Sequence, residues 1–523
     1  MKNRLQPHRP IAMWGAILIL VCLSLACVRS GQDGSGSLWS ISGLRQPTPT
    51  ATFALLLPAG GFVPTHPPGT PGLTPTPDNP HKLPGIRTDA RQHEVQPGET
   101  LGIIASEYGL SIDMLAEVNQ LANPDLLNVG QVLEIPAPTP VARGPAFKII
   151  PDSELVFGPA SVFFDIANFI HSQGGYLSTY REEVEENQVL SGAQIVERVA
   201  REYSVSPRLL LAVLEERSGW VTNAKPAAET LDYPIGVAEN RRKGLYRQLS
   251  YAANNLNRGY YLWRVGGAAT WLLTDNNLVP IDPTINAGTA GVQYFYATLL
   301  ALTEWSQAVG EEGLFGTFRA FFGYPFDLAY EPIVPADLTQ PELQLPFEAG
   351  KSWAFTGGPH AGWGDGSAWA ALDFAPPGDA LGCVLSNDWV VAVGDGPIVR
   401  SGNGAVIQDL DLPGLPADGL EQTGWTILYM HVETRDRIQA GVRLKADDHI
   451  GHPSCEGGVS SGTHVHLARR YNGEWIPADQ EAPFVLDGWI SSGDGKEYDG
   501  YLSRNGQVLE AYAGRSENNG IGR

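Results

Sequence analysis

The spacing of apolar positions divides the chain into two large regions of different character. Between residues 150 and 335, apolar side chains recur every three or four positions, as at Ile195, Val196 and Val199. This spacing places them on one face of an α-helix and predicts a mainly helical domain. From residue 345 to about residue 490, short apolar runs are broken by glycine, which predicts an all-β domain of antiparallel strands with many turns.

A smaller unit precedes both regions. Two helical patterns lie between two short strand-like runs, and Thr100 and Ser111 stand where a side-chain oxygen can cap each helix. This order predicts a small βααβ module. The sequence therefore indicates a multidomain protein with these parts: an export segment at residues 1–27, an extended linker at 28–91, the βααβ module at 92–136, a second linker at 137–149, the helical domain at 150–335, the β domain at 345–490 and a C-terminal extension at 491–523.

The N-terminal part carries no pattern of a folded core. Lys2 and Arg4 precede an apolar run at residues 11–26, which is the arrangement of an export signal. The run ends in "LSLAC" and resembles a bacterial lipoprotein box, which implies lipid attachment at Cys27 and hence a membrane anchor. Ordinary cleavage and an uncleaved anchor are the alternatives. Residues 46–84 then contain 11 prolines, too many for a packed core, and predict an extended, disordered tether.

Charge and cysteine content narrow the cellular setting. The formal net charge of −22 argues against a nucleic-acid partner, since such partners select basic surfaces. Two of the four cysteines, Cys22 and Cys27, belong to the export segment. Export implies an oxidising compartment, so the remaining pair, Cys383 and Cys455, is predicted to form a disulfide, with two free buried thiols as the alternative.

The βααβ module resembles a LysM module along its whole length. It opens with "VQPGETL", holds Asn119 in "LAEVNQL" and closes with "NVGQVLEIP". LysM modules bind glycans that contain N-acetylglucosamine, so the resemblance implies peptidoglycan or chitin as the ligand. The residues expected to contact the glycan are Pro97, Gly98, Glu99, Thr100 and Asn119, although Pro97, Gly98 and Asn119 can equally serve turns.

The stretch "VSPRLLLAVLEERSGW" in the helical region resembles the first catalytic helix of lysozyme-like lytic transglycosylases. In that family a glutamate directly before the serine is the catalytic acid, whereas Arg217 occupies this position here. A guanidinium group stays protonated at neutral pH and cannot act as the acid. The resemblance therefore implies a degenerate, non-catalytic lysozyme-like domain, with Glu216 acting as an acid as the alternative.

Histidines are concentrated in the β region, where six of the 11 in the chain lie. His464 and His466, in "GTHVHLARR", are two residues apart, so both imidazoles are expected on one face of a strand. His431 is expected to share a strand face with Ile427 and Tyr429. A catalytic zinc takes three protein ligands and leaves a fourth position open, while further imidazoles can transfer protons. The candidates for these roles are His360, Asp373, His431, His464 and His466.

The order and context of these residues resemble the lysostaphin-type (LytM-like) zinc endopeptidases over about residues 347–479. The strand "LYMHV" and the run "GGVSSGTHVHL" carry the signature of that family. The resemblance implies one Zn²⁺ in the domain, bound by His360, Asp373 and His466. It also implies that His464 and His431 form the catalytic pair.

The spacing of the first two ligands departs from the family pattern. His360 and Asp373 are 13 residues apart instead of the usual four, and Asp365 lies between them as a rival ligand. We prefer Asp373, because "ALDF" alternates like a strand and would hold the carboxylate rigidly, whereas Asp365 lies in a glycine-rich turn. His449 and His452 are predicted to be solvated turn residues.

Together these features predict an exported hydrolase of the cell wall. A zinc-dependent endopeptidase, targeted to glycan by its LysM module, would cleave peptide bonds in the stem peptides or cross-bridges of peptidoglycan. The alternative is a catalytically inactive wall-binding protein that activates another hydrolase. The presence of all five site residues favours the enzyme. A disulfide between Cys383 and Cys455 would tie the loop that leads into His464 to an early hairpin of the β domain.

Overall fold

The computed structural model describes residues 79–523 apart from 186–187, 379–380, 413 and 517. The predicted export segment, its lipidation site Cys27 and most of the first linker lie outside the described residues. Within the described part of the chain, no helix combines the length and the apolar character needed to cross a bilayer.

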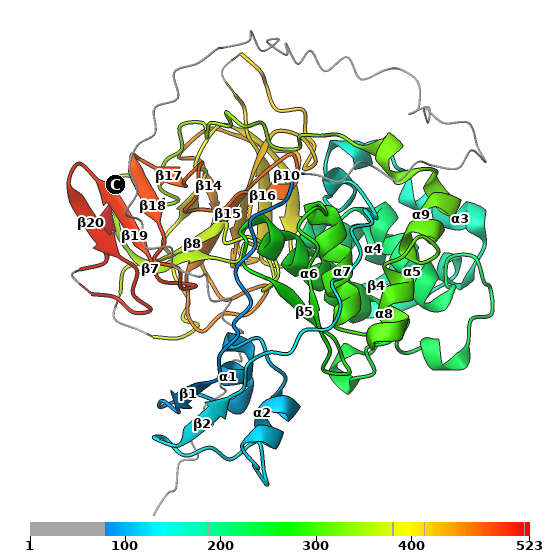
Figure 1. Ribbon diagram of the computed structural model, residues 1–523. Helices are drawn as coiled ribbons and strands as arrows, with labels where there is room; N and C mark the ends of the chain where they lie inside the picture. Colours follow the sequence, from blue (N-terminus) through cyan, green and yellow to red (C-terminus); the bar gives the residue numbers. More distant parts are fainter. Residues whose placement is uncertain (1–78, 186–187, 379–380, 413, 517) are drawn as a thin grey trace, which may run out of the picture.

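The N-terminal module has the predicted βααβ order (Figure 1). Its elements are β1 (Arg91–Glu94), α1 (Leu101–Glu107), α2 (Ile112–Val118) and β2 (Val132–Ile135). The two strands pair antiparallel, and the two helices pack over them around Ile104 and Leu115, which are fully buried. Thr100 and Ser111 cap the helices as expected, each accepting a hydrogen bond from a backbone N–H three residues on.

The second domain is mainly helical. Its helices are α3 (Ile166–Gln173), α4 (Gly192–Tyr203), α5 (Pro207–Ser218), α6 (Leu245–Arg264), α7 (Ala287–Ala297), α8 (Leu302–Ala308) and α9 (Leu314–Phe322), and its hairpins are β3 (Arg181–Glu185) with β4 (Gln188–Ser191) and β5 (Thr270–Leu272) with β6 (Leu278–Pro280). Residues 207–214 of α5 are all buried. A helix that is buried on all sides occupies the centre of a domain, and α4, α6 and α9 pack around this one.

The segment predicted as a second linker is bound to the helical domain. Val141 donates a backbone hydrogen bond to Leu278, and Gly144 donates one to Pro280, so the chain runs beside β6. The same hairpin extends to the N-terminal module, because Leu278 belongs to the buried core of that module and Leu272 packs against it. The module is therefore connected to the helical domain by packing as well as by covalent continuity.

The third domain is built on one large antiparallel sheet. Its strand order is β13-β10-β11-β12-β15-β8-β7-β21, with β16 pairing to β15, and a four-stranded sheet of β17 to β20 lies at its C-terminal side. The strands are β7 (Ser352–His360), β8 (Ala371–Ala375), β9 (Val390–Val391), β10 (Gly396–Gly402), β11 (Ala405–Asp409), β12 (Trp425–Met430), β13 (Arg443–Leu444), β14 (His449–Gly451), β15 (Val465–Tyr471), β16 (Glu474–Trp475), β17 (Val485–Leu486), β18 (Trp489–Ser492), β19 (Tyr501–Arg504), β20 (Gln507–Glu510) and β21 (Gly520–Gly522). The C-terminal extension thus belongs to this domain, since β21 pairs with β7.

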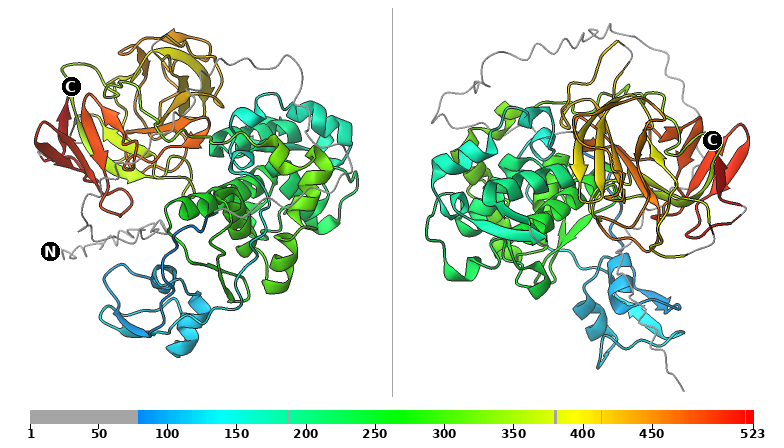
Figure 2. Two further views of the ribbon diagram at one scale, coloured as in Figure 1. Left: turned by 45° about the horizontal axis from the view of Figure 1, so that its top comes forward. Right: turned by 180° about the vertical axis from the view of Figure 1, so that it is seen from behind.

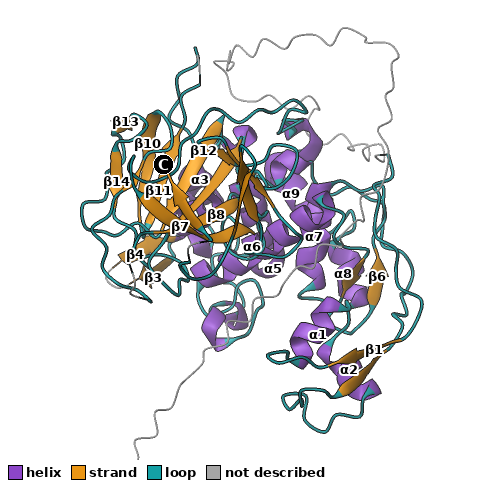
Figure 3. Cartoon of the chain, turned by 90° about the vertical axis from the view of Figure 1, so that its left-hand side faces the viewer, coloured by secondary structure: helices purple, strands orange, loops and turns teal. Residues whose placement is uncertain are grey.

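The two faces of the large sheet have different partners. Leu372 and Phe374 of β8 point into the core of the β domain. Ala371 points to the other face, where Ala468 of β15 and Leu428 of β12 join the core of the helical domain. The helical and β domains consequently lie side by side in both views of Figure 2, and the helices pack against the strands in Figure 3.

Candidate metal centre

Three neighbouring strands bring His360, Asp373 and His466 together. Asp373 lies in the middle of β8, directly opposite His466 of β15, and His360 is the last residue of β7 on the other side of β8. Irregular pairing between Gly357 and His360 lets the end of β7 turn its histidine toward Asp373. Gly357 leaves room for the carboxylate, since a Cβ there would lie 2.6 Å from Asp373 Oδ2.

The three side chains present their ligand atoms to one point. His360 Nε2 lies 2.9 Å from His466 Nδ1, and Asp373 Oδ1 lies 3.3 Å from the first nitrogen and 3.2 Å from the second. The outer ring nitrogens donate to backbone carbonyls, His360 Nδ1 to Gly358 (2.7 Å) and His466 Nε2 to Gly362 (3.1 Å). These hydrogen bonds assign the protons to the outer nitrogens, so the inner nitrogens carry lone pairs.

This donor set fits a divalent cation. Among the described residues, Asp373 Oδ1 is a buried oxygen without a hydrogen-bond partner, and it faces two nitrogen lone pairs. Three electron-rich atoms at this separation repel one another unless a cation lies between them. Tetrahedral zinc, with ligands at about 2.0–2.1 Å, separates its ligand atoms by about 3.3 Å. The same three residues form the potential metal-binding group found in the described part of the chain.

Two further imidazoles lie beside this group. His464 precedes β15, donates from Nδ1 to the Gly462 carbonyl (2.7 Å), and places Nε2 3.7 Å from Asp373 Oδ1. His431 donates from Nδ1 to the Glu456 carbonyl (3.0 Å), and its ring centre lies 4.5 Å from that of His464. In both histidines Nδ1 is engaged by a backbone carbonyl, and Nε2 lies on the opposite side of the ring. The structure brings all five predicted site residues to one end of the sheet.

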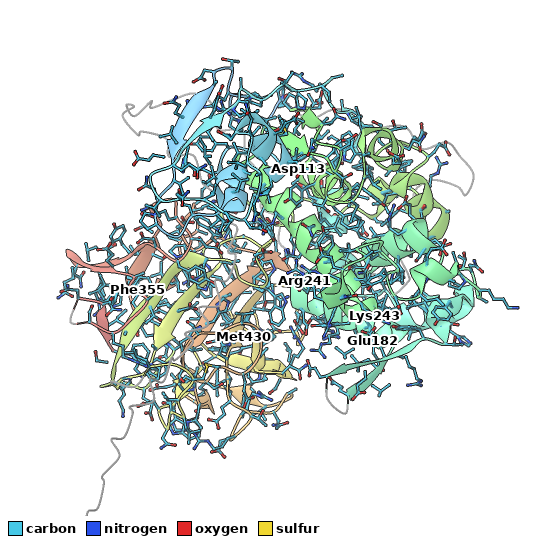
Figure 4. The ribbon with its side chains drawn as sticks, turned by 90° about the horizontal axis from the view of Figure 1, so that it is seen from below. Asp113, Glu182, Arg241, Lys243, Phe355 and Met430 are labelled. Carbon is cyan, nitrogen blue, oxygen red and sulfur yellow. A yellow bond between two sulfur atoms is a disulfide. The ribbon has the colours of Figure 1, made fainter. Side chains whose placement is uncertain are left out.

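The prediction that His431 shares a strand face with Ile427 and Tyr429 is wrong. Ile427 and Tyr429 lie in the core of the β domain, on the face away from the helices. The strand β12 ends at Met430, and His431 follows with a left-handed backbone of φ +64°. This conformation is costly for a non-glycine residue and breaks the alternation of side chains. As a result, His431 lies near His466. The residue before it, Met430, is labelled in Figure 4 and packs with the core of the helical domain.

Burial and charge set the protonation of the group. Burial alone raises the pKa of Asp373, but His360 and His464 outweigh it and hold this pKa well below its usual range. Burial, reinforced by the neighbouring His464, lowers the pKa of His431 to about 3. Burial also lowers the pKa of His466. The carboxylate is thus ionised while these two imidazoles are neutral at neutral pH, which are the protonation states that bind metals and accept protons.

The competing candidates lie in other surroundings. Asp365 Oδ2 is paired with Arg258 Nη2 of α6 at 2.8 Å, and its Oδ1 accepts from Asn254 at 2.6 Å. His449 stacks on Trp389 with ring centres 4.1 Å apart, and the inclined ring of His452 contacts the same Trp389 with ring centres 4.0 Å apart. His449 is exposed as expected, whereas His452 is only 4% exposed, so its prediction as a solvated residue is wrong.

The predicted disulfide between Cys383 and Cys455 is present, with the two Cα atoms 5.7 Å apart. It joins the loop before β9 to the loop that leads to His464. The two loops also meet through hydrogen bonds, since Thr463 donates from its backbone N–H to Gly382 and from its hydroxyl to Val384. The loop that leads to His464 and His466 is therefore covalently fixed to the loop before β9.

Sequence reasoning missed Tyr498. Its ring stacks on His360, with ring centres 4.2 Å apart and planes inclined by 20°. Backbone hydrogen bonds hold it there, from Gly358 N to Tyr498 O and from Tyr498 N to Pro359 O, with a left-handed φ of +67°. The C-terminal extension gave no signal for this contact, because an aromatic residue in a glycine-rich tail has no periodicity that places it.

The glycan-binding candidates of the N-terminal module take part in local structure. Asn119 donates to the carbonyls of Leu115 and Glu134 and accepts from Glu134 N. Glu99 accepts from Gln96 N and is paired with His93 at 2.8 Å. Gly98 has a φ of +90°, which favours glycine. Glycan contact by Pro97, Gly98, Glu99, Thr100 and Asn119 stays a prediction.

The candidate acid of the helical domain is also engaged. Glu216 Oε2 accepts a hydrogen bond from the buried Tyr296 hydroxyl at 2.8 Å. Arg217 donates to the carbonyl of Ile235, and Glu215 accepts from the backbone N–H of Val221. These contacts account for the polar groups at the end of α5 without a substrate, and the non-catalytic nature of the domain stays a prediction.

Two family models and several known proteins match parts of this chain. The family model of the LasA N-terminal domain matches residues 148–334, and that of the LysM domain matches residues 93–136. Protease LasA of Pseudomonas aeruginosa (strain UCBPP-PA14) is 24% identical over 298 residues, which are 52% of this chain and 65% of LasA. The beta-lytic metalloendopeptidase of Achromobacter lyticus is 27% identical over 178 residues, which are 32% of this chain and 43% of that protein.

The chain is therefore similar to LasA and to a beta-lytic metalloendopeptidase over part of its length, and it contains a region that matches the LysM family model. The predicted resemblance of its β domain to metalloendopeptidases is thereby confirmed. The helical region, which resembles transglycosylases in one helix, has its family match in the LasA N-terminal domain. The chain spans 65% of the length of the LasA sequence that it matches.

Two solved structures are also similar to part of this chain. The M23 metalloprotease pseudoalterin from the deep sea is 23% identical and covers 33% of this chain and 96% of its own, with a TM-score of 0.27. The catalytic domain of lysostaphin from Staphylococcus simulans is 22% identical and covers 24% of this chain and 88% of its own, with a TM-score of 0.17.

Proposed function

We propose that the protein is an exported, zinc-dependent endopeptidase that cleaves peptide bonds in the stem peptides or cross-bridges of peptidoglycan. The observation that carries this proposal is the convergence of two imidazole nitrogens and an unpartnered buried carboxylate oxygen beside two further histidines. Its LysM domain would hold the enzyme on glycan that contains N-acetylglucosamine. We also propose that the protein acts outside the cytoplasm, either anchored to the membrane through lipid at Cys27 or secreted and associated with the cell wall.

The ligands of the ion would be His360, Asp373 and His466. A bound Zn²⁺ supplies a positive charge that polarises the scissile carbonyl and lowers the pKa of water. The protein keeps this group rigid, because each ligand lies on a strand and each outer imidazole nitrogen is tied to a backbone carbonyl. Tyr498 covers one face of the His360 ring and limits its rotation.

The proton transfers would fall to His464 and His431. Each donates from Nδ1 to a backbone carbonyl, so each presents the lone pair of Nε2 on its other side. His464 approaches the ligand group and is placed to accept the proton of the attacking water and return it to the leaving amine. His431 is neutral at neutral pH. It can relay the proton from His464, and once His431 itself is protonated it can donate a hydrogen bond to the oxygen that gains negative charge.

The test uses the full chain, loaded with Zn²⁺, on purified peptidoglycan. Mass spectrometry of the released fragments should show new amino termini within stem peptides or cross-bridges, and the fragments should vanish with a chelator and in His360→Ala. Tight zinc binding without any fragment would overturn the endopeptidase and favour the alternative, a wall-binding protein that activates another hydrolase. Fragments that persist after metal removal would overturn the role of the metal.

A further inference from the structure

The loop between two of the proposed ligands also contacts the third. Residues 361–370 leave β7 after His360 and return to β8 at Ala371. The loop is closed by its own hydrogen bonds, from Gly362 N to Ala368 O (3.0 Å) and from Trp363 N to Ser367 Oγ (2.9 Å). The Gly362 carbonyl accepts the N–H of His466 Nε2. A shift of this loop would therefore remove the acceptor that keeps the proton on the outer nitrogen of His466.

The outer end of the same loop is held by the helical domain. Arg258 of α6 is paired with the Asp365 carboxylate at 2.8 Å and donates to the Asp365 carbonyl at 3.0 Å. Asn254, one turn earlier, donates to Asp365 Oδ1 (2.6 Å) and accepts from Gly366 N (3.0 Å). The fit requires glycine, because a Cβ on Gly366 would lie 1.9 Å from the Asn254 carbonyl oxygen.

These contacts form a polar clamp, which we define as Asn254 and Arg258 of α6 with Asp365 of the loop. Arg258 is only 7% exposed, so its charge is directed into the interface and not to solvent. Beyond the clamp, the loop rests on Trp475, whose indole N–H is bonded to the Tyr203 carbonyl of α4. The position of the Gly362 carbonyl thus depends on helices that do not belong to the β domain.

We propose that the helical domain is a positioning element of the metal centre, acting through the clamp on the 361–370 loop and through Gly362 on His466. The clamp residues touch neither substrate nor metal. They fix the imidazole of His466 with Nδ1 toward His360 and Asp373, where it would hold the ion, as outer hydrogen bonds fix metal-bound histidines in general. This inference rests on the proposed function to the extent that the centre binds a metal.

The experiment compares zinc affinity in full-length variants, measured by competition with a chromogenic chelator. Asp365→Ala and Asn254→Ala should each weaken Zn²⁺ binding by about 10-fold, the lower end of the range of about 10- to 100-fold for loss of an outer partner, because they displace the Gly362 carbonyl and do not remove it. The matched control is Arg201→Gln, which removes a different ion pair of the same interface, that between Arg201 and Glu421 (3.3 Å). It should leave zinc affinity within about twofold of wild type.

A spectroscopic readout separates positioning from general loss of structure. With Co²⁺ in place of zinc, Asp365→Ala should change the visible absorption of the bound ion, and ¹⁵N NMR should show the proton of His466 no longer confined to Nε2. Asp365→Asn, which keeps the acceptor for Asn254, should restore part of the affinity. Unfolding curves of the variants should stay cooperative.

Unchanged zinc affinity and Co²⁺ spectra in both clamp variants would overturn the inference, whatever the enzyme cleaves. Equal losses in Arg201→Gln would overturn it too, because the interface would then act as a whole. Zinc bound by wild type and weakened in the clamp variants, with no peptide cleaved by wild type, would support the inference and overturn the proposed function alone. A wild-type chain that binds no zinc would overturn both.

Discussion

The end of the large sheet and the end of α5 both gather ionisable side chains, but they use them differently. At the sheet, the four histidines are each anchored to a backbone carbonyl by one nitrogen, which leaves the other nitrogen free of that contact. At α5, Glu216 is bonded to the Tyr296 hydroxyl and Arg217 to a carbonyl. A reactive centre is thus recognised by donors and acceptors that its own fold leaves unpaired, and not by the number of charged residues.

Removal of a proposed metal ligand should have the largest effect, because it abolishes what distinguishes the end of the sheet from the end of α5. His466→Ala deletes one of three ligand atoms and leaves the Asp373 carboxylate with less compensation for its burial. We expect loss of bound zinc and of peptide hydrolysis, and the same result for His360→Ala. Metal analysis of the purified variants together with fragment release provides the check. Zinc content close to wild type in His466→Ala would show that the ligand set is misassigned.

Removal of a proton-transfer group should separate metal binding from catalysis. His464→Ala leaves the three ligands in place, so most of the zinc should remain. Hydrolysis should fall by about 10²- to 10⁴-fold, the usual contribution of a general acid or base. Steady-state rates normalised to bound zinc measure the effect. If His464→Ala empties the site while His466→Ala keeps it filled, the two histidines have exchanged roles.

An ion-pair cluster between the helical domain and the β domain predicts a response to acid. Glu421 is 2% exposed and paired with Arg400 (2.9 Å) and Arg470 (2.8 Å) of the sheet and with Arg201 of α4. Burial alone raises the pKa of Glu421, but Arg400 and Arg470 outweigh it and lower this pKa from 4.5 to about 2. A lowered carboxyl pKa gives stability that is complete above pH 4.5 and is lost as the pH falls toward 2.

The expected loss from this one group is on the order of 3 kcal/mol. Denaturant unfolding of wild type at pH 5 and pH 2.5 measures it, with Glu421→Gln as the control that has no carboxyl to protonate. The variant should be less stable at pH 5 and should show a smaller decrease on acidification. Parallel pH profiles of the two proteins would contradict the assignment to Glu421.

The smallest effect is expected at α5. Glu216→Gln keeps the hydrogen bond from Tyr296 and removes only the charge, so the fragments released from peptidoglycan should not change. Wild type itself should release no anhydro-muropeptides, because Arg217 stands where a transglycosylase has its acid. Anhydro-muropeptides that appear with wild type and disappear with Glu216→Gln would give the helical domain a glycan-cleaving activity.

Much of the centre was accessible from the sequence because its residues follow strand rules. The alternation of "ALDF" predicted that Asp373 lies on a strand, and the two-residue spacing of His464 and His466 predicted that both imidazoles share one face. Their proximity to Asp373 was implied by the family resemblance. His431 does not follow strand alternation, because its left-handed backbone turns its side chain away from the face of Ile427 and Tyr429. Tyr498 and the contact of Asp365 with α6 were beyond reach, because both depend on how distant parts of the chain pack.

The same limits apply to the domains: their order could be predicted from the sequence, but their packing against one another could not. Changes of periodicity separated the helical region from the β region, and cap residues defined the small module. Periodicity carries no information about which face of a sheet another domain will cover. The sequence therefore gave no indication that the helices lie on the face that bears Asp373 and His466.

The chain at residues 137–149 has a consequence for how the protein would work on a polymer. Since this segment runs beside β6 and the β5–β6 hairpin reaches the core of the LysM domain, that domain is held by a packed support. A flexible connection would let the centre search every peptide within the radius of its tether. A packed one sets an offset between the point of attachment and the point of cutting, so under the proposed function the spacing of cuts along a glycan strand would reflect the dimensions of the protein itself.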